Sequence, residues 1–224
     1  RQRQMCIRDR VVFAEGYDMA KVNLPYVEHL VKTLLWQWGG WKVVIGGPET
    51  VGNHIKNEYS WRGKRAFDAE FMGGVYEKPF TVEVAEFKDI PQLKEERLPL
   101  GGHLDGCRIG FDAGASDRKV AAVIDGEVAF SEEVVWDPKN HSDPQYHFDE
   151  IMSALRSATS HMPRVDAIGV SAAGIYINNR VRVASLFRGI PSELFEKRVK
   201  NLFLDIRKEW GDIPLEVVHD GDVA

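Results

Sequence analysis

The stretch from Arg108 to Val128 constrains the fold more than any other part of the chain. A short apolar strand, residues 108–111, leads into the carboxylate of Asp112 and then into a turn of small residues, 113–116. A second apolar strand, 120–124, returns at once. Asp125-Gly126 then predicts a tight turn into a third strand, because glycine accepts positive φ and Asp-Gly is a strong hairpin signal. The stretch therefore predicts three consecutive antiparallel strands.

The first of these turns has the chemistry of a phosphate site. Gly114, Ala115 and Ser116 leave backbone N–H groups without bulky side chains over them, a geometry that holds phosphate oxygens. Asp112 beside them is a candidate ligand of Mg²⁺, directly or through water, because magnesium prefers oxygen ligands and retains several waters. Together these are the parts of a phosphoryl-transfer site. From the residues alone, an ordinary hairpin with a solvated Asp112 remains the alternative.

The same residues resemble the first phosphate-binding hairpin of the actin-like ATPase superfamily, which includes hexokinase, Hsp70 and the ROK (repressor, open reading frame, kinase) sugar kinases. The usual string there is Asp, any residue, Gly, Gly, Thr, Lys. Asp112, Gly114 and Ser116 fit this string, whereas Ala115 replaces the second Gly and Asp117 stands where Lys is common. The resemblance implies ATP and Mg²⁺ as cofactors.

Length and composition exclude several classes of protein. The chain has 224 residues, 44% of them hydrophobic and 28% charged, which is enough for a real core in one or two domains. Its net charge of -5 gives no electrostatic reason to expect a nucleic-acid partner. Two cysteines, Cys6 and Cys107, make no disulfide framework, so a cytoplasmic protein is predicted. No stretch approaches the roughly 20 apolar residues of a membrane span, so no membrane partner is predicted.

The chain is predicted to contain three parts. Residues 1–10 are rich in arginine, resemble translated adapter sequence and are interpreted as a non-native scar. Residues 11–102 form a small α+β domain with a polar, proline-broken linker from Lys88 to Gly102. Residues 103–224 form the second domain, and they stop just as a new element should begin. We therefore expect a gene fragment that lacks the C-terminal half.

Periodicity predicts the elements of the small domain. Helices are predicted over Leu24–Trp38 and Glu49–Tyr59, and strands over Trp41–Ile45, Arg65–Phe71 and Phe80–Phe87. The turn at residues 46–52 admits an anion-loop interpretation, but its glycines lack dinucleotide-fingerprint spacing, and a plain strand-to-helix turn is favoured. The domain also carries a set of aromatic residues whose spacing favours core packing over a ligand platform. They are Trp36, Trp38, Trp41, Tyr59, Trp61, Phe67 and Phe71.

The second domain continues with a helix over Tyr146–His161, a strand over Val165–Val170, a helix from Pro191 to Trp210 and a strand over Leu215–Val218. The order is βββαβαβ, that of the ribonuclease-H-like lobe of an actin-like ATPase. Right-handed crossovers then place strands 108–112, 165–170 and 215–218 side by side and parallel, with their C-terminal ends along one crevice. The predicted fold class is therefore an α/β mixed sheet preceded by a small α+β domain.

That crevice collects three distant stretches. Asp112, the small-residue turn 171–174 and His219-Asp220 converge there. Asp220 is the candidate general base, which takes the proton from an attacking hydroxyl. Its alternative role is an N-cap of a helix that begins at Gly221 or Asp222.

The resemblance to ROK kinases extends to the residues that follow the predicted strand Leu215–Val218. That family carries Asn-Asp-Ala-Asn here, with the Asp as catalytic base and the first Asn on the sugar, and the present string is His219-Asp220-Gly221-Asp222. Its Gly-rich turn is matched loosely by residues 169–174. The resemblance implies a sugar-like substrate bound by Ser171, Ala172, Gly174 and His219, with Asp220 as the base.

ATP-dependent phosphorylation of a sugar or related hydroxyl compound is thus the leading hypothesis, and a homodimer is left open. The chain by itself is expected to be inactive, because the second phosphate hairpin and the adenosine motif of the family would lie beyond Ala224. An activator-type ATPase and a non-catalytic sugar-sensing regulator are the alternatives. A metal site at His141, Asp143 and His147 is less favoured than a solvated loop, because no pair of them shares a helix face or a strand end.

Overall fold

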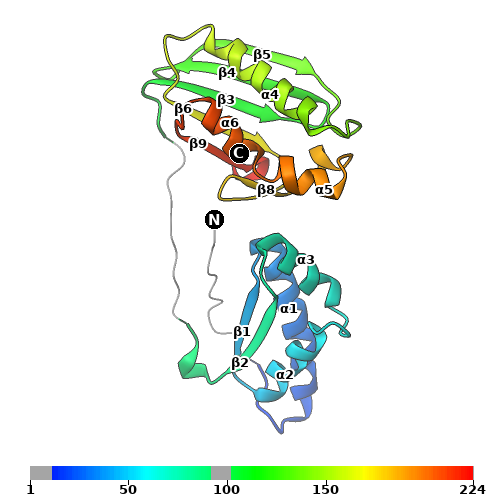
Figure 1. The fold of residues 1–224 in the computed structure, drawn as a ribbon. Helices are drawn as coiled ribbons and strands as arrows, with labels where there is room; N and C mark the ends of the chain where they lie inside the picture. Colours follow the sequence, from blue (N-terminus) through cyan, green and yellow to red (C-terminus); the bar gives the residue numbers. More distant parts are fainter. Residues whose placement is uncertain (1–11, 92–101, 224) are drawn as a thin grey trace. The chain divides into compact units, whose positions relative to one another are not determined.

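The computed structural model describes residues 12–91 and 102–223, which fall into two compact units, Arg1–Leu98 and Pro99–Ala224 (Figure 1). The predicted scar at residues 1–10 and most of the predicted linker lie outside the described residues.

The first unit is a two-stranded parallel sheet with three helices. Its α-helices and strands are α1 (Asn23–Trp38), β1 (Lys42–Gly46), α2 (Glu49–Glu58), α3 (Ala66–Tyr76) and β2 (Thr81–Ala85), with 3₁₀ turns η1 (Asp18–Val22) and η2 (Phe87–Asp89). The strands pair in register from Lys42 opposite Thr81 to Gly46 opposite Ala85. The buried core comprises Val31, Leu35, Ile55, Tyr59, Met72 and Val82. The two long helices and both strands of the sheet confirm the prediction from periodicity.

The predicted strand at Arg65–Phe71 is wrong, because this segment begins helix α3. The buried residues of α3 are Asp68, Met72 and Val75, which follow the helical spacing i, i+4, i+7. The topology also requires a crossover here. Two parallel strands cannot be joined by a tight turn, and the connection between β1 and β2 contains α2 and α3.

The expectation that the aromatic set packs in the core holds only in part. Tyr59 is buried, but the exposed fractions of Trp36, Trp61 and Phe67 are 45%, 78% and 67%. Trp36 stacks on Phe71 at a ring-centroid distance of 5.1 Å, and its indole Nε1 donates to Asp68 Oδ1 at 2.6 Å. Trp36, Phe67 and Phe71 therefore form a stacked group at the edge of the core, against which Phe71 packs.

The second unit is built on a five-stranded mixed sheet. Its strands are β3 (Cys107–Ala113), β4 (Asp117–Ile124), β5 (Glu127–Val135), β6 (Ala167–Ala172) and β9 (Leu215–His219), in the spatial order β5-β4-β3-β6-β9. The remaining elements are α4 (Pro144–Thr159), the hairpin β7 (Ile175–Ile177) and β8 (Arg180–Val183), η3 (Ser185–Phe187), α5 (Ser192–Leu194), the π-turn η4 (Phe195–Val199), α6 (Leu202–Glu209) and η5 (Asp220–Asp222).

Strand directions confirm the predicted ribonuclease-H-like fold class. β3 pairs antiparallel with β4 and parallel with β6, and β6 pairs parallel with β9. The first turn after β4 places Asp125 and Gly126 at φ 50° and 88°, as the Asp-Gly hairpin signal predicts. Asn178 and Asn179, at φ 53° and 60°, form the tip of the β7-β8 hairpin. The three central strands are thus parallel and adjacent.

The two faces of the sheet differ in burial. Helices α4 and α6 lie over the same face (Figure 1), where they pack against alternate strand residues such as Ile109, Phe111 and Val170. The intervening residues point to the opposite face, and there Gly110 and Gly169 are exposed. Asp112 and Ser171 belong to this second, more open face.

The helix predicted from Pro191 to Trp210 is interrupted. The Lys200 amide donates to the Phe195 carbonyl at 3.0 Å, a bond from i+5, and a regular helix resumes only at Leu202. The interruption coincides with a contact to the β7-β8 hairpin. The Lys200 carbonyl accepts the Val181 amide of β8 at 3.1 Å, so the helix end and the hairpin share a hydrogen bond.

Candidate functional site

The hairpin between β3 and β4 carries the first candidate group. Asp112 is half-buried near the end of β3, and its cross-strand partner in β4 is Lys119. The buried residue Trp136 holds this turn through two hydrogen bonds. Its indole Nε1 donates to the Gly114 carbonyl at 2.9 Å, and its backbone amide donates to the Ser116 carbonyl at 3.1 Å. Trp136 therefore fixes the shape of the turn that was predicted to receive phosphate.

Gly114 is required by this shape. A Cβ atom at residue 114 would lie 2.5 Å from the Asp117 carbonyl oxygen and 2.9 Å from Asp117 Oδ1. Ala115 and Ser116, in contrast, are exposed at the tip, where Ser116 Oγ donates to Asp117 Oδ2 at 3.4 Å. The tip thus presents small residues to solvent.

Asp117 and Lys119 form an ion pair on the hairpin. Lys119 Nζ donates to Asp117 Oδ1 at 2.7 Å. This hydrogen bond lowers the pKa of Asp117, and together with the nearby charge of Asp112 it raises the pKa of Lys119. Asp117, which stands where the family string has Lys, is therefore accompanied by a cation two residues later. Sequence reasoning missed Lys119, although its alternation with Asp117 in a strand was a usable signal.

Register brings the turn after β6 beside the hairpin. Asp112 pairs with Ser171, and Ser171 pairs in turn with Val218 of β9. Paired residues of adjacent strands direct their side chains to the same face, so Asp112 and Ser171 are neighbours on the open face. Ala172 points the other way and is buried in the core, so only its backbone is available to a ligand.

Gly174 closes the turn after β6 against β8. Its φ is +151°, and a Cβ atom there would lie 2.6 Å from the Val183 carbonyl oxygen. The following Tyr176 donates its hydroxyl to the Ala173 carbonyl at 3.4 Å. Burial raises the pKa of the Tyr176 phenol, and the charge of Asp220 raises it further.

The end of β9 carries His219 and Asp220, whose side chains are about half exposed, at 51% and 49%. The Gly221 amide donates to Asp220 Oδ1 at 2.8 Å, and His219 Nδ1 lies 2.8 Å from the same oxygen. His219 Nδ1 also lies 2.9 Å from the Gly221 amide, so its tautomer decides whether it accepts from Gly221 or donates to Asp220. The alternative role of Asp220 as an N-cap is wrong, because the short turn η5 begins at Asp220 itself and its N-cap is His219, whose side chain accepts the Gly221 amide.

The second loop that drew attention in the sequence has separate roles for its three residues. Asp143 caps α4, because its Oδ1 accepts the Gln145 amide at 2.9 Å. The exposed His141 stacks on Tyr146 at 3.6 Å between ring centroids. The prediction of a solvated loop is wrong for His147, which is 0% exposed and has Nε2 2.9 Å from the Pro138 carbonyl oxygen. A histidine on the inner face of an amphipathic helix was the missed signal.

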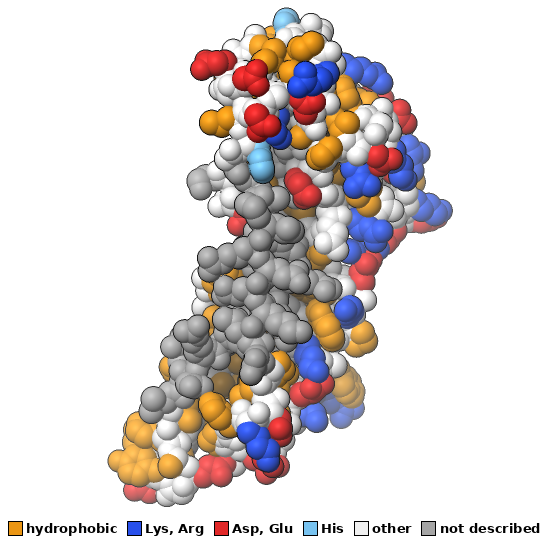
Figure 2. Space-filling view, turned by 90° about the vertical axis from the view of Figure 1, so that its left-hand side faces the viewer, with side chains coloured by type: hydrophobic (Ala, Val, Ile, Leu, Met, Phe, Trp, Pro, Cys, Tyr) orange, Lys and Arg blue, Asp and Glu red, His pale blue; other side chains and the backbone are white. Residues whose placement is uncertain are grey.

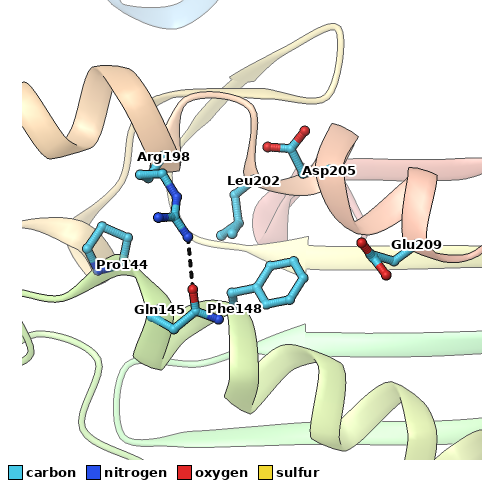
Figure 3. Close-up of a pocket in the computed structure, with 7 residues that line it drawn as sticks. All are labelled: Pro144, Gln145, Phe148, Arg198, Leu202, Asp205 and Glu209. Carbon is cyan, nitrogen blue, oxygen red and sulfur yellow. Dashed lines mark hydrogen bonds between the residues drawn. The ribbon is translucent and has the colours of Figure 1, made fainter.

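A pocket of the second unit lies away from these groups (Figure 3). It opens between α4 and α6, where Arg198 donates from Nη2 to Gln145 Oε1 at 2.8 Å beside Phe148 and Leu202. These helices cover the face of the sheet opposite to Asp112 and Ser171. The pocket therefore contains none of the predicted site residues.

Surface charge and helix length give two further observations. On the face drawn in Figure 2, acidic and basic side chains are interspersed. Within residues 12–91 and 102–223, every helix is too short or too polar to cross a bilayer.

The residues near Asp112 fit a magnesium ion and a phosphate group. A half-buried carboxylate at a strand end supplies the oxygen ligand that Mg²⁺ prefers. Lys119 opposite Asp112 adds a positive charge, which attracts phosphate. The Gly114 turn leaves its tip uncovered by large side chains. Asp112 is therefore the residue that would hold the ion, and the hairpin backbone would receive phosphate oxygens.

Comparison with known proteins gives structural neighbours only. No protein-family model and no curated protein matches the chain. An inorganic polyphosphate/ATP-glucomannokinase from Arthrobacter sp. strain KM is 18% identical, with a TM-score of 0.40 over 53% of this chain and 46% of that chain. A glucokinase from Parabacteroides distasonis is 15% identical, with a TM-score of 0.40 over 52% and 31%.

A ROK-family transcriptional regulator described as a homologue of the E. coli MLC protein is 14% identical, with a TM-score of 0.36 over 89% of this chain and 46% of that chain. The chain thus spans less than half the length of each of these three structures. A functional assignment therefore rests on the geometry of the chain itself.

Proposed function

We propose that this chain supplies part of the site of an ATP-dependent kinase that phosphorylates a sugar or related hydroxyl compound. In this proposal Asp112 organises Mg²⁺ through water, and the turn from Gly114 to Ser116 receives phosphate oxygens. Asp220 acts as the general base. Ser171, the backbone of Ala172, Gly174 and His219 contact the substrate. The protein acts in the cytoplasm, consistent with Cys107, a free buried thiol of the described residues.

The observation that carries the proposal is the alignment of three parallel strand ends. Asp112 and Ser171 are paired neighbours on one face, and Ser171 pairs with Val218, two residues before Asp220. β3 and β9 are separated by β6 alone, so their backbones are about 10 Å apart at a strand spacing near 4.8 Å. This separation suits a phosphate group on one side and an attacking hydroxyl on the other.

The chain's residues then divide the work of phosphoryl transfer. Asp220 accepts the proton of the substrate hydroxyl while the hydroxyl oxygen bonds to the γ-phosphorus of ATP. The bond from this phosphorus to the leaving oxygen of ADP breaks at the same time. Asp112 would hold Mg²⁺, which would supply positive charge to the phosphate oxygens. Lys119 and the hairpin amides add positive charge at the same place. Trp136 keeps the hairpin in shape through its bond to Gly114.

The test compares Asp220→Asn with Asp222→Asn in the full-length protein that contains this chain. Asp222 is an exposed carboxylate in the same short turn, outside the proposed site. ADP release is measured with and without a panel of hexoses. We expect Asp220→Asn to lower sugar-dependent release by about 10²-fold or more, the usual contribution of a general base, and Asp222→Asn to leave it unchanged.

The same measurement separates the alternatives. Equal loss of sugar-dependent and sugar-independent release in Asp220→Asn would favour the activator-type ATPase. Unchanged ADP release in that variant, with retained sugar binding, would contradict the kinase proposal and favour a sugar-sensing regulator.

A further inference from the structure

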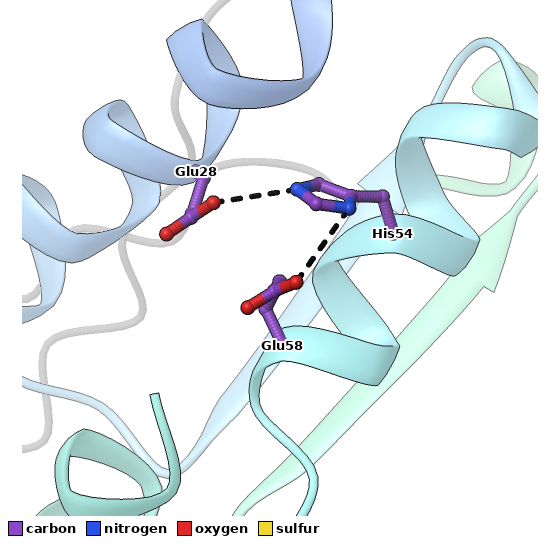
Figure 4. Close-up of side chains that lie close together, drawn as sticks. All are labelled: Glu28, His54 and Glu58. Atoms are coloured by element: carbon purple, nitrogen blue, oxygen red, sulfur yellow. Dashed lines mark hydrogen bonds and ion pairs between the residues drawn. The ribbon is translucent and has the colours of Figure 1, made fainter. Parts of the chain in front are cut away.

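Three potential metal ligands meet in the first unit, on the side chains of Glu28, His54 and Glu58 (Figure 4). Glu28 comes from α1, and the other two come from α2. His54 and Glu58 are four residues apart, so they lie on one face of α2. Figure 4 shows both carboxylates directed at the imidazole. The group is separate from the proposed kinase residues, all of which belong to the second unit.

The spacing of the donor atoms suits one small ion. His54 Nε2 lies 3.3 Å from Glu28 Oε2, and His54 Nδ1 lies 3.9 Å from Glu58 Oε1. One ligand atom from each of the three residues falls within 4.8 Å of the others. Ligands of a tetrahedral zinc ion with bonds of about 2.0–2.2 Å are separated by about 3.4 Å. The two carboxylates contact opposite nitrogens of the ring, so the imidazole has to turn for one of its nitrogens to share an ion with both carboxylates.

The outer oxygens of both carboxylates are already held by other groups. Arg65 donates from Nε and Nη2 to Glu28 Oε1, at 3.1 and 3.0 Å, and the Lys64 amide donates to Glu58 Oε2 at 3.3 Å. These contacts leave Glu28 Oε2 and Glu58 Oε1 facing His54. Hydrogen bonds that orient ligating carboxylates in this way are typical of metal sites in proteins.

Charge at this group also favours a cation. Glu28 is 7% exposed, and the buried Asp68 adds a further carboxylate, 3.8 Å from Arg65. Glu28, Glu58 and Asp68 thus supply three carboxylates beside Arg65 and Lys64.

We propose that Glu28, His54 and Glu58 form a zinc-binding site that joins α1 to α2. One imidazole nitrogen and two carboxylate oxygens are common ligands of Zn²⁺, and a water completes four-coordination. The imidazole favours a transition metal over Mg²⁺ or Ca²⁺, which prefer oxygen ligands alone. Metal bound between the two helices would stabilise the small core of this unit.

The test is calorimetric titration of Zn²⁺ into the chelator-treated chain, with four proteins compared. They are the wild type, His54→Ala, Glu58→Gln and the control His29→Ala, which removes an exposed histidine next to Glu28. We expect one zinc ion per chain in the wild type and the control. We expect at least 10-fold weaker binding in His54→Ala and Glu58→Gln. Co²⁺ in place of Zn²⁺ should give visible absorption bands that only the wild type and the control show.

Circular dichroism confirms that each variant is folded, and Glu58→Gln preserves the size of the side chain if His54→Ala fails to fold. Zn²⁺ should raise the thermal midpoint of the wild type, whereas Mg²⁺ at the same concentration should not. Absence of Zn²⁺ binding to the wild type would overturn the proposal. Equal binding by all four proteins, or equal loss in the His29→Ala control, would also overturn it, because the metal would then lie elsewhere.

Discussion

Replacing Gly114 by Ala tests whether the hairpin after β3 has one defined shape. The added Cβ would lie 2.5 Å from the Asp117 carbonyl oxygen, whereas an ordinary contact begins at 3.4 Å. Asp117 would have to retreat by roughly 1 Å, and overpacking of this kind typically costs about 1–3 kcal/mol. That retreat would strain the Lys119 ion pair and the Trp136 hydrogen bonds, which hold the same turn.

Gly110→Ala is the matched control, because Gly110 lies in β3, which leads into this turn, and nothing is within 4 Å of its Cβ position. A Gly-to-Ala change that the folded backbone tolerates raises the free energy of unfolding by about 0.4–1 kcal/mol, because it lowers the conformational entropy of the unfolded chain. The chain has two units, so unfolding is best read from hydrogen exchange of β3 and β4 amides rather than from one global transition.

We expect these amides to exchange about 5- to 140-fold faster in Gly114→Ala, since 1.4 kcal/mol corresponds to a factor of ten. In Gly110→Ala they should exchange as slowly as in the wild type or more slowly. Equal exchange in the two variants would refute the close approach of Asp117 to Gly114 and, with it, the defined hairpin on which the phosphate contacts depend.

Two further predictions concern polar contacts of buried groups. Trp136→Phe removes the hydrogen bond from the indole to the Gly114 carbonyl, so we expect the free energy of unfolding to fall by about 1–3 kcal/mol. The amides of residues 114–117 should then exchange hydrogen faster, and unchanged exchange there would contradict the prediction. Hydrogen bonds from His54 and Arg65 lower the pKa of Glu28 in the folded chain. Ionised Glu28 therefore adds its full contribution to the free energy of unfolding above the ordinary pKa of 4.5, and this contribution disappears as the pH falls through the folded-state pKa. Urea unfolding of Glu28→Gln should therefore show a loss of about 1–3 kcal/mol at pH 7 that shrinks below pH 4.5, and a pH-independent difference would count against this explanation.

Much of the second unit could be predicted from the sequence because its signals are local and redundant. Alternation in β3, the Asp-Gly turn at Asp125 and the periodicity of α4 each predicts an element, and right-handed crossovers leave few ways to arrange them. The parallel neighbours β3, β6 and β9 follow from those rules. Register was beyond reach, because the pairing of Asp112 with Ser171 depends on packing against α4 and α6.

The first unit exposes the limits of local signals. A short apolar segment such as 65–71 is consistent with either a strand or a helix. It begins the helix α3 in the structure, within the connection that the parallel strands β1 and β2 require. The burial of the aromatic side chains could not be predicted from the sequence either. Trp36 satisfies its indole on Asp68 and stacks on Phe71, so it remains ordered while 45% exposed. No spacing rule distinguishes this arrangement from a core position.

The N-cap of η5 is His219 rather than Asp220, so capping does not compete with a role of Asp220 as general base. The described hydrogen-bonding contacts of its carboxylate, with the Gly221 amide and His219 Nδ1, both use Oδ1. A carboxylate can accept at either oxygen, so Oδ2 is available for a substrate proton. The Gly221 amide then orients the base, in the way that supporting hydrogen bonds hold catalytic groups in position. If this is its role, Gly221→Pro, which removes the amide donor, should lower sugar-dependent turnover of the full-length protein while leaving sugar binding intact.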